Sequence, residues 1–267
     1  MAEDVGDGDH STLASIPKKA VSKARLLVKE DGILAGIELA QSIFHYFDPS
    51  LRFETILTDG TSVKKGEVAF TVHGSARSIL TTERLVLNCM QRMSAIATKT
   101  RTLTSFLEGT NTRLLDTRKT TPNARLIEKW AVFIGGGQNH RIGLYDMIML
   151  KDNHIDMAGG IEQAINRTKD YLRASKKNLR IEIETRSLAE VQEVIKIGGV
   201  DIVMLDNMLA HEMSKAVFLI NKKFQTEASG GITQENIAEV AKCGVDFISV
   251  GALTNGVKSM DLSLKAF

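Results

Sequence analysis

The residues best suited to chemistry lie in one stretch, from Asp116 to His154, which reads DTRKTTPNARLIEKWAVFIGGGQNHRIGLYDMIMLKDNH. Five of its cationic residues stand near segment ends, where a folded chain can turn them toward one point: Arg118, Lys119, His140, Arg141 and Lys151. The chain as a whole is nearly neutral, with 34 basic and 32 acidic residues. A local cluster of cations in such a chain indicates a binding site for small, highly charged anions.

The composition is that of an ordinary globular protein, with 43% hydrophobic and 25% charged residues in a chain of 267. The absence of a long lysine and arginine run argues against a nucleic-acid partner. No apolar run approaches the roughly 20 residues that span a bilayer, and the acidic N-terminus lacks a signal-peptide pattern. Cys89 and Cys243 lack metal-site and redox-motif spacing. We therefore expect a cytoplasmic protein with no membrane partner.

The first part of the chain alternates short apolar runs with turn signals at Asp31-Gly32 and Asp59-Gly60. Apolar residues at helical spacing lie between these turns, so we expect a small α+β domain with a mostly antiparallel sheet. Residues 76–108 are helical by composition, and Gly109 is the expected stop. Arg92 lies in this helix, and its spacing alone favours a solvated surface arginine.

After Asn111 short apolar strands alternate with amphipathic, helix-length segments, which predicts a parallel sheet. The strands read TRLLD, MIMLK, RIEIE, DIVMLD, FQTEAS and DFISVG. No GxGxxG follows the first strand, so a closed or nearly closed α/β barrel is favoured over a dinucleotide-binding sheet. We place a first domain at residues 1–108, to which 258–267 return, and the barrel at 109–257.

The carboxyl ends of these strands carry polar or glycine-rich residues, and active sites of α/β barrels form at that end. In chain order the ends are Thr117 to Lys119, Lys151 to His154, Glu184, Asp206-Asn207, Ser229-Gly230-Gly231 and Gly251-Ala252. The last two glycine-rich ends occupy the late loops where barrel enzymes frequently hold a phosphate. Tight-turn glycines would give the same pattern, but two such loops in the two expected positions favour a phosphate site.

Glu184 and Asp206 end neighbouring strands, where a carboxylate pair could bind ribose hydroxyls, coordinate Mg²⁺ or stabilise a developing cation. Glu184 could equally pair with a barrel lysine. Glu182 lies on the same side of the strand as Glu184, so one of the two is a candidate for a buried salt bridge. His140 and Arg141 precede their strand, and simple topology sends them to the opposite face. They reach the site only if residues 135–146 form an extra strand or excursion.

Taken together, these stretches resemble the quinolinate phosphoribosyltransferase family, which decarboxylates its substrate in de novo NAD synthesis. The matching stretches run over nearly the whole chain: EDVGDGD, ERLVLNCMQRMSAIAT, DTRKTTPNARLIEKWAV, GGGQNHRIGLYDMIMLKDNHI, EIET, MLDNM, EASGGIT and GVDFISVGALT. The resemblance implies an N-terminal α/β sandwich domain, an open, incomplete TIM-like α/β barrel and a homodimer. It also implies that quinolinate and phosphoribosyl pyrophosphate react, with Mg²⁺, to nicotinate mononucleotide, pyrophosphate and carbon dioxide.

The resemblance also assigns roles to residues. The quinolinate carboxylates would be held by Arg118, Lys119, His140 and Arg141, with Thr117 beside them and Lys151 near the sugar donor and pyrophosphate. Glu184 and Asp206 would face the ribose and the metal, and Ser229, Gly230, Gly231, Gly251 and Ala252 the 5′-phosphate. Catalysis would fall to Lys119, Lys151, Glu184 and Asp206. Arg92 would come from the other subunit, which replaces the surface interpretation above.

One departure concerns the segment after VGALT, where the family usually has His-Ser and this chain has Asn255-Gly256. A histidine that could contact phosphate or pyrophosphate is therefore replaced. Two alternatives stay open at this point. One is a related phosphoribosyltransferase that uses nicotinate or another aromatic acid, and the other is a non-catalytic barrel that binds phosphosugars.

Overall fold

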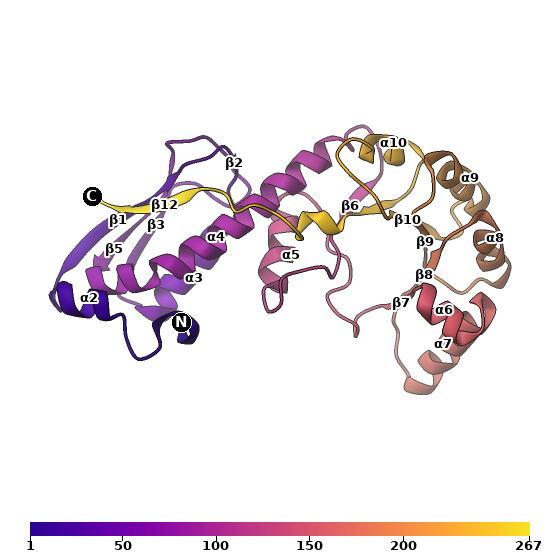
Figure 1. Ribbon diagram of the computed structural model, residues 1–267, viewed down its shortest axis with the longest axis horizontal. Helices are drawn as coiled ribbons and strands as arrows, with labels where there is room; N and C mark the ends of the chain where they lie inside the picture. Colours follow the sequence, from indigo (N-terminus) through magenta and orange to yellow (C-terminus); the bar gives the residue numbers. More distant parts are fainter. The chain divides into compact units, whose positions relative to one another are not determined.

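The computed structural model describes residues 1–267, which form two compact units (Figure 1). The first unit consists of residues 1–101, 121–136 and 253–267, and the second of residues 102–120 and 137–252. The expected barrel range of 109–257 thus includes two segments that group with the first unit. Close packing explains this for the helix that ends at Ile134, because a Cβ on the next residue, Gly135, would lie 2.6 Å from the Ala97 carbonyl oxygen.

The first unit contains an antiparallel sheet with the strand order β12-β1-β5-β3. Its strands are β1 (Val21–Val28), β3 (Arg52–Thr55), β5 (Val68–Ser75) and β12 (Leu262–Ala266). A second, two-stranded sheet pairs β2 (Gly32–Ile33) with β4 (Ser62–Val63). The end of the chain therefore returns to the first unit, where Leu264 is paired with Leu26.

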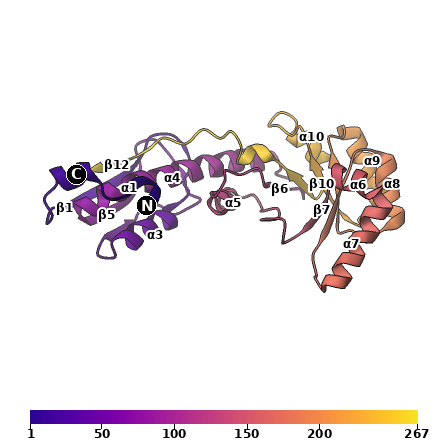
Figure 2. The same ribbon diagram turned by 60° about the horizontal axis from the view of Figure 1, so that its bottom comes forward.

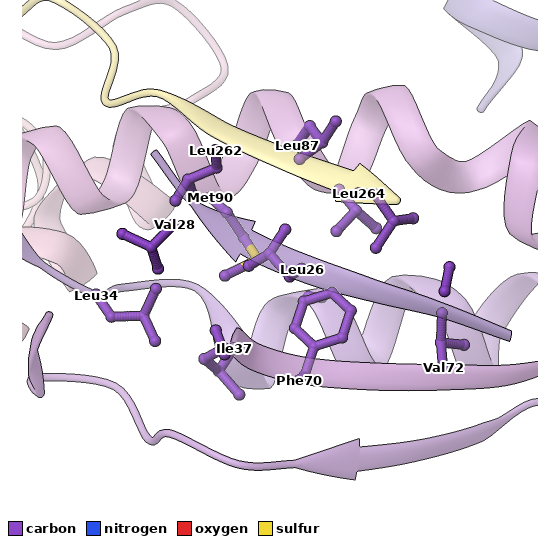
Figure 3. Close-up of a cluster of buried hydrophobic side chains, with 14 of the residues drawn as sticks. Leu26, Val28, Leu34, Ile37, Phe70, Val72, Leu87, Met90, Leu262 and Leu264 are labelled. Carbon is purple, nitrogen blue, oxygen red and sulfur yellow. The ribbon is translucent and has the colours of Figure 1, made fainter. Parts of the chain in front are cut away.

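The helices of this unit are α1 (Ala2–Val5), α2 (His10–Ser15), α3 (Ile37–Phe47), α5 (Arg125–Ile134) and most of α4 (Ala76–Ser105). The strand β1 buries every second side chain at its end, which gives the main sheet one apolar face. Figure 3 shows this face packed against Ile37 of α3 and Met90 of α4, around the fully buried Phe70. None of the helices combines the length and the apolar character needed to cross a bilayer.

The second unit contains a six-stranded parallel sheet with the order β6-β11-β10-β9-β8-β7. Its strands are β6 (Arg113–Leu115), β7 (Ile148–Leu150), β8 (Ile181–Thr185), β9 (Ile202–Asp206), β10 (Gln225–Ser229) and β11 (Phe247–Ser249). No pairing joins β6 to β7, so the barrel is open. The prediction of a mixed α/β chain with an open, incomplete barrel is confirmed.

Helices follow the strands of this barrel, as a parallel sheet requires. They are α6 (Asp152–Ala158), α7 (Ile161–Ser175), α8 (Leu188–Ile197), α9 (Ala210–Ile220), α10 (Ile237–Lys242) and the short 3-10 helix η1 (Gly251–Leu253). Figures 1 and 2 show α6 to α9 along one side of the sheet. Every residue of β8 is buried, since the strand is covered on both faces.

Candidate active site

A cavity of about 300 Å³ lies within the second unit and is lined mainly by residues at or just beyond the carboxyl ends of its strands. Its lining consists of Thr117, Arg118, Lys119, His140, Arg141, Met149, Lys151, Met204, Glu227, Ser229 and Ser249. The five cationic residues singled out in the opening stretch therefore meet in one place. The volume suits a small, substituted ring rather than a polymer. The Nε of Arg118 is buried without a hydrogen-bond partner, and this orphan donor points to an anionic ligand.

The position of His140 and Arg141 depends on an excursion of the chain before β7. Gln138 forms a parallel bridge with Leu115 at the end of β6. The fully buried carboxylate of Asp116 then accepts hydrogen bonds from the Asn139 side chain at 2.7 Å and from the His140 backbone N–H at 2.9 Å. This pairing carries residues 139–141, which we call the NHR segment, to the carboxyl end of the sheet. The topology question left open by the sequence is thereby resolved in favour of the site.

Beyond the NHR segment the chain makes a loop, and Arg141 donates a hydrogen bond to the Met147 carbonyl oxygen in it at 3.2 Å. The carboxylate of Asp146 accepts hydrogen bonds from the backbone N–H groups of Ile142 and Gly143, at 2.7 and 2.9 Å. Burial lowers the pKa of Arg141, and the nearby charge of Arg118 lowers it further. The positive charges of these two guanidinium groups repel each other in a half-buried cavity, so both are suited to bind one shared anion.

His140 is held by two carboxylates that are themselves fully buried. Its Nε2 lies 2.9 Å from Glu182 and 3.4 Å from Glu227, and the His140 side chain is 6% exposed. Burial alone would lower the pKa of His140, but Glu182 and Glu227 outweigh it and raise the pKa to about 9. Burial and the charge of Glu227 raise the pKa of Glu182, against the effect of His140. Of the two alternating glutamates of β8, Glu182 is thus the one in a fully buried ion pair.

Glu184 and Asp206 lie close enough for their charges to interact. Burial raises the pKa of Glu184; Lys151, whose Nζ lies 3.4 Å away, lowers it, and Asp206 raises it. Asp206 accepts a hydrogen bond from the side chain of Asn207 at 2.6 Å. Two repelling carboxylates form an all-oxygen donor set, which fits Mg²⁺. The cluster of His140, Glu182 and Glu227 also brings potential ligand atoms within 4.8 Å of one another, but its imidazole and cationic neighbours suit Mg²⁺ less well.

The glycine-rich ends have backbone and space requirements that other residues would not meet. Gly230 has φ +86°, and a Cβ there would lie 2.3 Å from the side-chain oxygen of Asn207. A Cβ at Gly251 would lie 2.9 Å from the Lys119 side chain, and Ala252 follows in η1. Gly231 has φ +62° and faces open space. These positions allow a close approach of a ligand to the backbone.

Arg92 is not among the residues that line the cavity. Within the first unit its Nε and Nη2 lie 3.0 and 2.9 Å from the fully buried Glu128, and it donates to the carbonyl oxygens of Thr254 and Val257. With 23% of its side chain exposed, Arg92 is no solvated surface arginine, and that interpretation from spacing is wrong. Its expected role across a subunit interface stays a prediction.

Sequence reasoning singled out neither Asp116, which orders the NHR segment, nor Glu227 and Ser249, which line the cavity. One signal for Glu227 was available. In the strand QTEAS alternation places Glu227 on the same face as Ser229, which is one of the predicted site residues. An acidic residue inside a buried parallel strand is uncommon, since such strands are usually apolar.

An open α/β barrel whose strand ends gather cations, a carboxylate pair and glycine-rich loops defines a site for phosphorylated and carboxylated substrates. The family described as "Quinolinate phosphoribosyl transferase, C-terminal domain" matches residues 96–265, and its N-terminal domain matches residues 9–94. The chain therefore belongs to the quinolinate phosphoribosyltransferase family, and the resemblance stated from its motifs is confirmed.

Relatives from plants and bacteria agree with this assignment. The quinolinate phosphoribosyltransferase [decarboxylating] 1b of Nicotiana tabacum is 47% identical over 280 residues, which cover 99% of this chain and 79% of that protein. The probable nicotinate-nucleotide pyrophosphorylase [carboxylating] of Synechocystis is 42% identical and covers 99% and 89%. Among solved structures, NadC from Streptococcus pyogenes superposes with a TM-score of 0.93 at 40% identity, over 99% of this chain and 92% of that one. Human nicotinic acid phosphoribosyltransferase, at 14% identity over 96% of this chain and 72% of that one, with a TM-score of 0.67, shares the fold alone.

Proposed function

We propose that this chain transfers a phosphoribosyl group from phosphoribosyl pyrophosphate to quinolinate. The reaction gives nicotinate mononucleotide, pyrophosphate and carbon dioxide, a step of NAD biosynthesis. The observation that carries the proposal is the cavity that joins the NHR segment to Arg118 and Lys119, with a buried Arg118 donor that lacks an acceptor. The relatives named above are called quinolinate phosphoribosyltransferases or nicotinate-nucleotide pyrophosphorylases.

The residue types fit a dicarboxylate that must be oriented. Planar guanidinium groups bind planar carboxylates through paired hydrogen bonds, so Arg118 and Arg141 suit the carboxylates of quinolinate. Once both are held, the ring nitrogen is positioned against the anomeric carbon of the sugar donor. Lys151, beside Glu184, would neutralise the negative charge that develops on the leaving pyrophosphate. The glycine-rich ends would hold the 5′-phosphate through backbone N–H groups.

We also propose Mg²⁺ as the metal of this site, held by Glu184 and Asp206. When bound, it would supply charge neutralisation for the pyrophosphate. Treatment with a chelator should abolish turnover, and Mg²⁺ should restore it. The Glu184→Gln variant should require a higher Mg²⁺ concentration for half-maximal activity. Turnover that persists without any divalent cation would refute this assignment.

A homodimer in which Arg92 reaches the partner's site is a further part of the proposal, supported by the family resemblance. Mixing an Arg92→Ala subunit with an Arg118→Ala subunit should restore part of the activity, because some mixed dimers would contain one intact site. Mixed dimers as inactive as their parents would show that Arg92 acts only inside its own subunit. A cytoplasmic location stays a proposal, since some plant relatives are named as chloroplastic or mitochondrial.

The decisive assay uses purified protein, phosphoribosyl pyrophosphate and Mg²⁺, with quinolinate and nicotinate supplied separately, and follows nicotinate mononucleotide. Product from quinolinate alone is the expected result. Turnover of nicotinate without turnover of quinolinate would instead favour a related phosphoribosyltransferase. Binding of phosphoribosyl pyrophosphate with no turnover of either acid would favour a non-catalytic barrel.

A further inference from the structure

The floor of the cavity contains polar atoms that the protein itself does not satisfy. Glu227 is fully buried, and neither of its carboxylate oxygens has a hydrogen-bond partner. The Oγ of Ser249, which is 4% exposed, also lacks a partner. Both residues line the cavity. Burying such groups without partners is costly, so their presence points to a task that involves a bound molecule.

The contact between Glu227 and His140 does not by itself account for Glu227. Glu182 already accepts the close hydrogen bond of His140 at 2.9 Å, whereas Glu227 lies 3.4 Å away. Glu182 is not part of the cavity lining, and Glu227 is. One carboxylate is therefore placed behind His140, and the other faces the space that the substrate ring would occupy.

A carboxylate at this point is unexpected if the cavity only binds a dicarboxylate, because the two would repel each other. It becomes useful once the ring changes charge. In the proposed reaction the lone pair of the ring nitrogen forms the bond to the anomeric carbon. The bond from that carbon to the pyrophosphate oxygen breaks, and its electron pair leaves with pyrophosphate. The ring thereby becomes a pyridinium cation inside a cavity lined by Arg118, Lys119 and Arg141.

We propose that Glu227 is a catalytic residue whose carboxylate offsets the positive charge that forms on the substrate ring during phosphoribosyl transfer. This inference rests on the proposed function. Glu227 would stabilise the transition state more than the bound substrate, because the free substrate ring carries no such charge. The later loss of carbon dioxide leaves its bonding pair on the ring carbon, which takes a proton from solvent water. Glu227 need not donate that proton.

The test compares the Glu227→Gln and Glu182→Gln variants with the wild-type enzyme. For each protein, kcat and KM for quinolinate are measured, together with the Kd of benzene-1,2-dicarboxylate, which carries both carboxylates but no ring nitrogen. Glu227→Gln should lower kcat by ~10²-fold, the range seen when one preorganised electrostatic group is removed. Its KM and the Kd of the dicarboxylate should be unchanged or lower, because a repelling charge is gone. Glu182→Gln should instead raise both constants, because His140 loses its hydrogen-bond partner.

Glu227→Gln should fold, since the side-chain volume is unchanged and His140 keeps its closer partner, Glu182, at 2.9 Å. Should it unfold, Glu227→Asp decides the matter: it retains the charge, and its kcat should stay within ~10-fold of wild type. A kcat unchanged in Glu227→Gln, or the same rise of KM and Kd in both glutamine variants, would overturn the inference. Wild-type protein that makes no product from quinolinate would overturn the proposed function itself, and the inference with it.

Discussion

The charge of His140 can be tested directly, because its ring contacts two carboxylates that favour the charged form and one backbone N–H that favours the neutral form. Glu182 and Glu227 raise the pKa of His140 to about 9, against an ordinary value of 6.5. That difference corresponds to about 3 kcal/mol, at 1.36 kcal/mol per pKa unit. The backbone N–H of Arg141 has the opposite effect on this pKa. It donates a hydrogen bond to Nδ1 of His140 at 2.7 Å and so favours the neutral ring. A neutral hydrogen bond contributes about 1 kcal/mol net, so the effect of the two carboxylates on the pKa of His140 is the larger one.

The measurement is an NMR titration of the histidine rings, of which the chain has six. One resonance should titrate near pH 9 and be missing from a His140→Asn variant. In Glu182→Gln the same resonance should titrate at a lower pH, because burial of the ring is then opposed by one carboxylate fewer. If all the histidines titrate below about pH 7.5, near the ordinary value, the carboxylates do not control His140 and the reasoning fails.

The raised pKa of His140 also makes the free energy of unfolding depend on pH in a defined direction. A histidine whose pKa is raised by folding contributes stability that is fully present below the unfolded pKa and is lost as the pH rises through the folded one. The free energy of unfolding of wild type should therefore fall by up to about 3 kcal/mol between pH 6.5 and 9, as measured by urea denaturation. His10, which is largely exposed, offers a matched control, since His10→Asn should leave this loss unchanged.

The remaining predictions concern residues that hold the site and its surroundings in place. Asp116→Ala removes the acceptor of two hydrogen bonds from the NHR segment, so urea denaturation should show a loss of ~3 kcal/mol or more and kinetics a raised KM for quinolinate. Arg92→Ala and Glu128→Ala should not be additive, with a coupling of ~1 kcal/mol or more in a double-mutant cycle of unfolding free energies. Gly230→Ala forces a Cβ into contact with Asn207 at φ +86°, which should cost about 1–3 kcal/mol of stability and weaken phosphoribosyl pyrophosphate binding in calorimetry.

Much of the architecture could be predicted because it is encoded locally. Alternating apolar strands and amphipathic helices indicated six parallel strands, and the structure has that number in one open sheet. The polar residues that follow each strand marked the functional end, since parallel strands share their carboxyl edge. The return of the chain end also had a local sign, because the apolar alternation of its last residues is that of a strand.

What could not be predicted depends on partners far apart in the sequence. Nothing near Gln138 shows that it pairs with Leu115, and this pairing, together with the hydrogen bonds to Asp116, brings the NHR segment to the site. Arg92 has the spacing of a surface residue, yet the carboxylate it binds is contributed by a helix 36 residues further along. The buried glutamates behind His140 likewise become intelligible only when three separate segments are brought together.

The arrangement of charge suggests why the site would choose a diacid over a monoacid. Arg118, Lys119, His140 and Arg141 carry four positive charges, and Glu182 and Glu227 carry two negative ones, so this part of the site has a formal charge of +2. Quinolinate, with two carboxylates, balances that charge, whereas nicotinate would leave one positive charge desolvated in a confined cavity. Discrimination would then come from charge balance as much as from shape. Because His140 supplies one of the four charges, the preference for quinolinate should decline as the pH rises through about 9, in step with the NMR titration of His140.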